Sequence, residues 1–157
     1  MKYLSLGSYS SGTMRSEDLI PTFLDALESV DPVRAREIRL ENLSLLNALD
    51  AKGEAWDALA EEASMFVDDL FDVLNEYCAP YTYFSASEGD GADYGCWAEV
   101  DALKEDMTYG DVLDFDKVDT HDLIDGTLVA HISDHGNIEL FQSNGPNKPL
   151  TSLWSLV

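Results

Sequence analysis

The spacing of apolar residues changes near Pro80, and this change constrains the fold more than any other feature of the chain. Before Pro80, apolar residues recur every three or four positions, which is the period of an amphipathic helix. After it, short aromatic and β-branched runs alternate with turns rich in Gly, Asn and Asp, which is typical of strands. Helices followed by strands predict an α+β fold, with about three N-terminal helices packed on a C-terminal antiparallel sheet.

Three helices are expected before Pro80. Asp18 is the predicted N-cap of the first helix, which leaves Pro21 in the first turn, where a missing N–H does little harm. Asp31 followed by Pro32 begins the second helix. Pro80 limits the third, because a residue that precedes proline avoids the α region. The expected ranges are about 18–30, 31–53 and 54–77.

The second half contains two predicted hairpins and a final strand. The first hairpin has a long connection rich in Gly and Asp, and the second turns at Asp134–Gly136. The expected strands are 81–84, 94–97, 127–133, 137–141 and 152–157. No internal repeat or long linker divides the sequence, so residues 1–157 are expected to form a single α+β domain.

The net charge is extreme. Thirty-one acidic residues face nine basic ones, a formal charge of -22, yet 45% of the residues are hydrophobic, which is enough to build a core. Such a surface repels phosphate, so direct binding to nucleic acid is not expected, and basic proteins or cations are the expected partners. The excess is uneven: it is -3 over residues 1–50, -11 over residues 51–100 and -8 over residues 101–157.

The expected compartment is the cytoplasm. The first residues lack the long apolar core of a signal peptide, and no stretch approaches the ~20 apolar residues that span a bilayer. No membrane partner is therefore expected. Cys78 and Cys96 are predicted to be reduced and partly buried, because two cysteines without an export signal rarely form a disulfide.

The third predicted helix carries eight carboxylates. At 100° per residue they fall within an arc of about 140°, and only Met65 interrupts them. The opposite side of this helix, from Trp56 to Tyr77, is apolar and is expected to face the core. No Lys or Arg occurs between Glu54 and Glu99 to offset their repulsion. As one helix this segment spans about 33 Å, over which a DNA strand shows about ten phosphates. The eight residues are Glu54, Asp57, Glu61, Glu62, Asp68, Asp69, Asp72 and Glu76.

Three interpretations of these carboxylates stay open. They bind the basic groove of a nucleic-acid-binding protein by mimicking DNA, they form an ordinary solvated helix face, or they reflect adaptation to high salt. The alternative to a binding role is thus a salt-adapted or divalent-cation-binding structural protein. If the chain binds a partner, Asp90, Asp93, Asp101 and Glu105 are possible extensions of the surface.

No metal site or catalytic group is expected. The loop over residues 88–95 and the run Asp114-x-Asp116-x-x-Asp119 lack the ligand register of an EF-hand. The three histidines have acidic neighbours, but that is unavoidable in so acidic a chain. No nucleophile elbow, P-loop or zinc-protease motif occurs. The sequence thus predicts a binding protein without cofactor rather than an enzyme.

Three segments resemble known sequences. They are residues 88–95 followed by Trp97, residues 133–137 (Ser-Asp-His-Gly-Asn), and the closing residues 153–157. Over about a third of its length the chain resembles uncharacterised small acidic proteins carried by phages and mobile elements. That family has no assigned activity. The resemblance implies a setting in which DNA-mimicking anti-restriction proteins are common, and so favours mimicry.

Overall fold

The structure, a computed structural model, describes residues 2–157 and confirms the α+β class. The chain forms two compact units, which are described separately below. The helical unit comprises the residues up to Cys78 together with Phe84–Trp97, and the C-terminal unit comprises Ala79–Tyr83 and Ala98–Val157. The single domain expected from the sequence stays a prediction, because a division into two compact units does not show whether each unit folds by itself.

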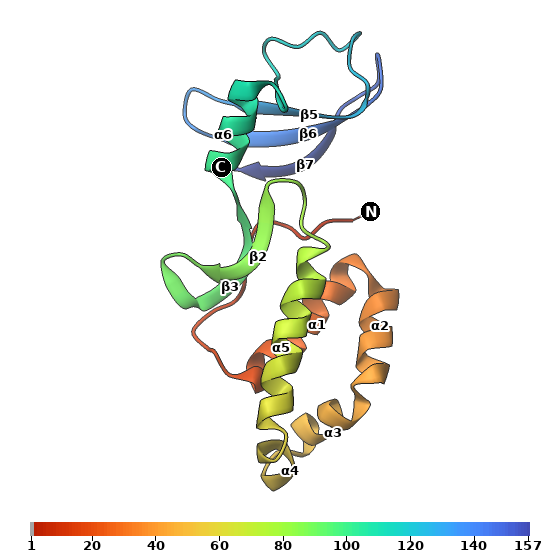
Figure 1. Cartoon of the computed structure of the whole chain (residues 1–157), viewed down its shortest axis with the longest axis vertical. Coiled ribbons are helices and arrows are strands. Elements are labelled where there is room, and N and C mark those ends of the chain that lie inside the picture. Colours follow the sequence, from red (N-terminus) through yellow and green to blue (C-terminus); the bar gives the residue numbers. More distant parts are fainter. Residues whose placement is uncertain (1) are drawn as a thin grey trace. The chain divides into compact units, whose positions relative to one another are not determined.

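The helical unit combines five helices with a three-stranded sheet (Figure 1). Helix α1 contacts both α2 and α5, and the strand order is β1-β3-β2. Strand β1 was not predicted from the sequence. The elements are β1 (Gly7–Ser10), α1 (Ser16–Val30), α2 (Pro32–Glu41), α3 (Leu43–Ala51), α4 (Glu54–Asp57), α5 (Ala60–Asn75), β2 (Thr82–Ser87) and β3 (Asp90–Ala98).

Aromatic rings join the helices to the sheet in the core of this unit. Phe23 of α1 is fully buried, and its ring centroid lies 5.1 Å from those of Phe71 and Phe84 and 5.9 Å from that of Tyr94. These edge-to-face contacts add to the burial of apolar area. The N-terminal helices therefore share their core with β2 and β3.

The first predicted helix boundary is wrong. Helix α1 begins at Ser16, so Asp18 is its third residue and not its N-cap. The Thr13 hydroxyl donates a hydrogen bond to the Asp18 carboxylate at 2.7 Å. Pro21 lies in the second turn, where it removes the N–H that would bond to the Glu17 carbonyl.

The second and third predicted helices are each divided in two. Asn42 separates α2 from α3, and its side chain donates to the Ile38 carbonyl at 2.9 Å, a local bond that competes with helix continuation. Ala58 and Leu59 separate α4 from α5, and the Leu59 N–H bonds to the Trp56 carbonyl three residues back. Neither Pro nor Gly stands there, so the pattern of apolar residues gave no warning of this break.

The predicted long loop of the first hairpin is also wrong. A two-residue turn, Glu88–Gly89, joins β2 to β3, and residues 90–95 belong to β3. Gly95 is required by a close approach rather than by a positive φ. A Cβ atom placed there would lie 2.3 Å from the Gly7 carbonyl oxygen and 2.8 Å from the Trp97 ring.

The C-terminal unit contains a helix and a four-stranded sheet of order β4-β5-β6-β7. The second predicted hairpin and the final strand are confirmed, with Ile132 opposite Ile138. The sheet is antiparallel except for the parallel pair β4-β5, and neither β4 nor α6 was predicted. The elements are α6 (Val100–Tyr109), β4 (Leu113–Asp114), β5 (Asp125–Ile132), β6 (Ile138–Asn144) and β7 (Thr151–Leu156).

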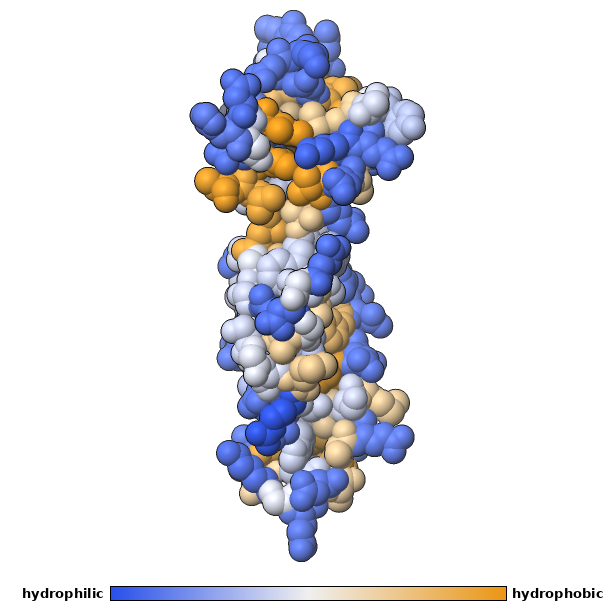
Figure 2. All heavy atoms as spheres, turned by 90° about the vertical axis from the view of Figure 1, so that its left-hand side faces the viewer, coloured by the Kyte–Doolittle hydropathy of each residue, from blue (hydrophilic) through white to orange (hydrophobic). Residues whose placement is uncertain are grey.

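Hydrogen bonds attach the segment Ala79–Tyr83 to the rest of the C-terminal unit, among them one from the Glu99 N–H to the Tyr81 carbonyl at 2.8 Å. The indole N–H of Trp154 donates to the Pro80 carbonyl at 2.8 Å, and the Tyr81 hydroxyl donates to Asp106 on α6. Burial, and then this bond to Asp106, raises the pKa of Tyr81 to about 12. Hydrophobic side chains gather on the face of this unit seen in Figure 2, and its exposed aliphatic residues are Ile124, Leu156 and Val157.

Candidate partner-binding face

The eight predicted carboxylates of residues 54–76 are all exposed. They lie on two helices rather than one: Glu54 and Asp57 belong to α4, and the other six to α5 and its C-cap. The opposite side of α5 is buried, as predicted. Its buried residues are Ala63, Phe66, Val67, Leu70 and Leu74.

We use the term acidic stripe for the six carboxylates of α5 and its C-cap. At 100° per residue they cover an arc of about 120°, and at 1.5 Å per residue they extend over about 22 Å. The break before α5 thus overturns the expected continuous 33 Å row. The charge density is little changed, because a DNA strand shows about seven phosphates over the same length. The stripe consists of Glu61, Glu62, Asp68, Asp69, Asp72 and Glu76.

The acidic stripe differs from the acidic surface of α1 and α2 in its lack of ion pairs among the described residues. Within residues 2–157, no Lys, Arg or His lies within salt-bridge distance of any of its six carboxylates. Arg34, on the neighbouring helix α2, pairs instead with Glu37 at 3.6 Å. Water and dissolved salt are therefore what screens the repulsion between these carboxylates.

A hollow with an apolar component borders the acidic stripe. It has a volume of about 400 Å³, and both Met65 and Phe66 line it together with Glu61, Glu62 and Asp69. Met65 lies in the middle of the stripe and is 63% exposed. A partner that meets the stripe would therefore contact apolar surface as well as charge.

The four other predicted carboxylates lie on different elements. Asp90 and Asp93 belong to β3, where Asp90 accepts the Ala92 N–H at 2.9 Å and Asp93 accepts the Ser8 hydroxyl. Their side chains thus form hydrogen bonds within the small sheet. Asp101 and Glu105 are exposed on α6, in the C-terminal unit.

The carboxylate of Asp31 has a structural role in the helical unit. Asp31 caps α2, because its side chain accepts the N–H groups of Arg34 at 2.9 Å and Val33 at 3.1 Å, and it also accepts the Tyr77 hydroxyl at 2.8 Å. The Arg34 N–H and then the Tyr77 hydroxyl lower the pKa of Asp31 below its usual value. The predicted start of the second helix is confirmed.

The residues considered for metal binding do not converge. Within residues 2–157, no three His, Cys, Asp or Glu side chains are placed to hold an ion together. Asp114 instead forms an ion pair with Lys117 at 2.6 Å and accepts the Asp116 N–H. His131 lies 3.9 Å from Asp116 and contacts the Phe115 ring. Over the same residues, no helix has the length and apolar character needed to cross a bilayer.

The two cysteines lie side by side. Cys96 is buried in β3 and Cys78 is half-buried after α5, as predicted, with their sulfur atoms 3.8 Å apart. Both are thiols in this structure.

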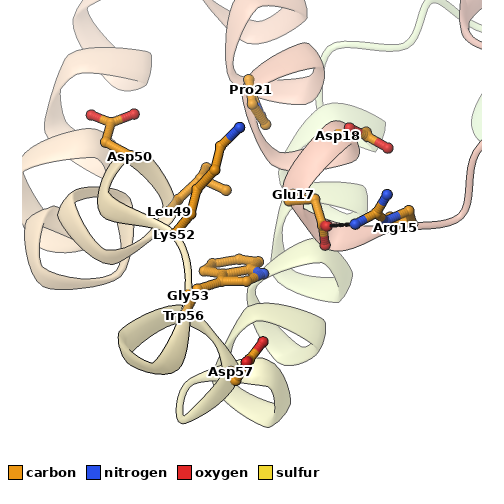
Figure 3. A pocket seen from close by; sticks show the side chains of 10 residues that line it. All are labelled: Arg15, Glu17, Asp18, Pro21, Leu49, Asp50, Lys52, Gly53, Trp56 and Asp57. Carbon is orange, nitrogen blue, oxygen red and sulfur yellow. Dashed lines mark hydrogen bonds and ion pairs between the residues drawn. The ribbon is translucent and has the colours of Figure 1, made fainter.

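A second feature of the helical unit is a cavity beside Trp56, which was not predicted from the sequence (Figure 3). The helical pattern placed Trp56 on the core side, and the ring is in fact half-buried at the cavity. The available signal was Lys52-Gly53, the last two residues of the second predicted helix. Both residues have positive φ angles, 58° and 69°, so the chain turns sharply there.

Comparison with known protein families, with curated proteins and with solved structures finds no match for this chain. The resemblance to small acidic proteins of phages and mobile elements therefore stays a prediction from the sequence. Function is inferred below from the charges and the geometry of the chain itself.

Proposed function

We propose that this chain is a non-catalytic binding protein whose acidic stripe occupies the basic nucleic-acid-binding groove of a partner protein. The observation that carries the proposal is the set of six exposed carboxylates on one helix side without a single ion pair among residues 2–157. Like charges at this spacing weaken a helix. A partner rich in Lys and Arg would remove that repulsion on binding.

The mechanism is electrostatic competition. The negative field speeds association with a basic groove, and a spacing close to that of DNA phosphates lets the stripe pair with the cations that normally hold the nucleic acid. Met65, in the middle of the stripe, adds apolar contact area that salt does not screen. The partner's groove, once filled, no longer accepts nucleic acid.

The test begins with capture of basic proteins from a bacterial lysate at low salt, followed by displacement of labelled duplex DNA from each purified candidate. We expect the chain to release the DNA. Reversal of Asp68, Asp69 and Asp72 to Lys should weaken this competition by at least about a hundredfold, because each attractive contact becomes repulsive. Raising the salt concentration should weaken it steeply.

The matched control reverses Asp111, Asp122 and Asp134, three exposed carboxylates of the C-terminal unit, to Lys. This variant has the same net charge as the stripe variant and should keep most of the activity. Equal loss in both variants would show that net charge, and not the stripe, drives binding. If no candidate releases its DNA and molar KCl raises the melting temperature by tens of degrees, salt adaptation replaces the proposal.

A further inference from the structure

The cavity beside Trp56 has the size of a small-molecule site. It lies among the start of α1, the end of α3 and helix α4, and its volume is about 550 Å³. Pockets that bind small molecules typically have volumes of ~300–1,000 Å³. In Figure 3 the side chains of Lys52 and Trp56 face those of Glu17 and Arg15 across this space.

A strained corner of the backbone forms one wall. Lys52 has a φ of 58° and Gly53 a φ of 69°, and the chain turns here from α3 into α4. A left-handed conformation is unfavourable for a residue with a Cβ. The corner keeps Trp56 at the cavity instead of continuing α3.

Trp56 supplies an open aromatic surface. The two other tryptophans donate their indole N–H groups to carbonyls, Trp97 to Ser85 at 2.9 Å and Trp154 to Pro80 at 2.8 Å. Within residues 2–157, the Trp56 indole N–H makes no such bond. Its ring is half-buried, so one part packs against the core while another borders the cavity.

The charges of the cavity favour a positive ligand. Two cationic and four carboxylate side chains line it, which leaves a net charge of -2. Arg15 is paired with Glu17, so Lys52 is the one cation left to offset three carboxylates. A cation gains from this field and from the face of an indole ring. The three carboxylates are Asp18, Asp50 and Asp57.

We infer that this cavity is a binding site for a small organic cation, a molecule with guanidinium or alkylammonium groups, which stacks on Trp56 and pairs with the surrounding carboxylates. A dication would neutralise the lining. The site does not depend on the acidic stripe, and its occupancy is a second function beyond the proposed one.

Agmatine, a guanidinium joined to an ammonium by a short alkyl chain, is a suitable probe. The full chain labelled with ¹⁵N shows three indole N–H signals, and Trp56→Phe identifies the one from Trp56. Titration at constant ionic strength should move this signal along a saturable curve. The signals of Trp97 and Trp154 should stay in place.

Variants of the lining test the chemistry. In variants that lack the Trp56 indole, binding is followed through the backbone amide signal of Gly53, which also lines the cavity. Trp56→Leu should weaken agmatine binding by about tenfold, whereas Trp56→Phe keeps an aromatic face and should cost about threefold. Asp57→Asn should weaken binding by about threefold, and Asp101→Asn, the same change on α6, should have no effect. Lys52→Gln should tighten binding by about threefold, because it removes a like charge.

Three results would overturn the inference. The first is a Trp56 shift that NaCl reproduces at the same ionic strength. The second is equal weakening by Asp57→Asn and Asp101→Asn, which would mean unspecific attraction. The third is arginine, with its carboxylate, binding more tightly than agmatine, which would make this a site for zwitterions. Unchanged Trp97 and Trp154 signals in each variant show that the chain is still folded.

Discussion

Carboxylates on the surface of α1 and α2 form ion pairs, whereas those of the acidic stripe on α5 form none within the described residues. On the first surface Arg39 bridges two helices, because its guanidinium donates to Asp25 at 2.9 Å and to Glu28 at 2.6 Å. On the stripe, six carboxylates follow one another, and no ion pair with any of them occurs in the described part of the chain, residues 2–157. The two surfaces belong to neighbouring helices of the same unit.

The difference shows that basic residues offset the carboxylates on one surface of this chain and not on the other. Four of its nine basic residues lie in or just before α1 and α2, and none lies in α4, α5 or β3. Folding alone gives no reason for that distribution, since unopposed like charges weaken a helix. The contrast therefore supports a role for the stripe outside the fold.

The largest expected change in melting temperature distinguishes Asp31, whose carboxylate accepts hydrogen bonds, from Asp72 of the stripe. Asp31→Ala removes the cap of α2 and the partner of the Tyr77 hydroxyl, and should lower the melting temperature by about 3–6 °C. Asp72→Ala removes repulsion from Asp68 and Glu76 and should raise it by about 1–2 °C. Thermal unfolding of the two variants measures both. Changes of the same sign would contradict the distinction.

The stabilising contribution of Asp31 should decrease at acidic pH. The pKa of Asp31 is lowered in the folded chain, so its contribution to stability is complete above the unfolded pKa, near 4, and is lost as the pH falls below that value. The difference in melting temperature between the natural chain and Asp31→Ala should thus shrink from pH 6 to pH 3. A difference that stays constant with pH would mean that the charge of Asp31 is irrelevant.

A single cation in the stripe should have an intermediate effect. Met65→Lys places an ammonium three or four residues from each of four carboxylates. Each such pair stabilises a helix by a few tenths of a kcal/mol, so the melting temperature should rise by about 2–4 °C at low salt. The four carboxylates are Glu61, Glu62, Asp68 and Asp69.

Met65→Gln is the matched control for this substitution, because it removes the apolar side chain without adding charge. It should leave the melting temperature within about 1 °C. The gain from Met65→Lys should vanish in 1 M KCl, where charges at this distance are screened. An increase in melting temperature that persists in 1 M KCl, or that Met65→Gln also gives, would mean that repulsion between the carboxylates of the stripe does not destabilise the helix.

The smallest effect is expected on the compensated surface. Arg39→Gln breaks the ion pairs with Asp25 and Glu28, and both carboxylates are more than half exposed. Exposed pairs contribute little, so the melting temperature should fall by less than about 2 °C, and only at low salt. A larger fall would mean that exposed ion pairs stabilise this chain more than they stabilise most proteins. The unpaired carboxylates of the stripe would then destabilise it by more than is assumed above.

Local patterns predicted the parts of the fold that are formed by neighbours in sequence. The buried side of α5, the cap at Asp31 and the hairpin of β5 and β6 each follow from residues close together in the chain. The strand β1 and the parallel pair β4-β5 were missed, because each is defined by pairing with distant residues and β4 is only two residues long. Helix α6 was missed although it is local, since it buries only Leu103 and so shows little periodicity.

The candidate site divides in the same way. The sequence by itself determined that six carboxylates share one side of α5, because helical geometry fixes the angle between residues whatever surrounds them. Only the tertiary structure decided that the row ends at Leu59, that Asp93 bonds to Ser8, and that a cavity opens beside Trp56. The bond of Asp93 and the cavity depend on packing between segments that are distant in sequence, and no local pattern records which segments meet. The break at Leu59 is a local turn, but no Pro or Gly marks it in the sequence.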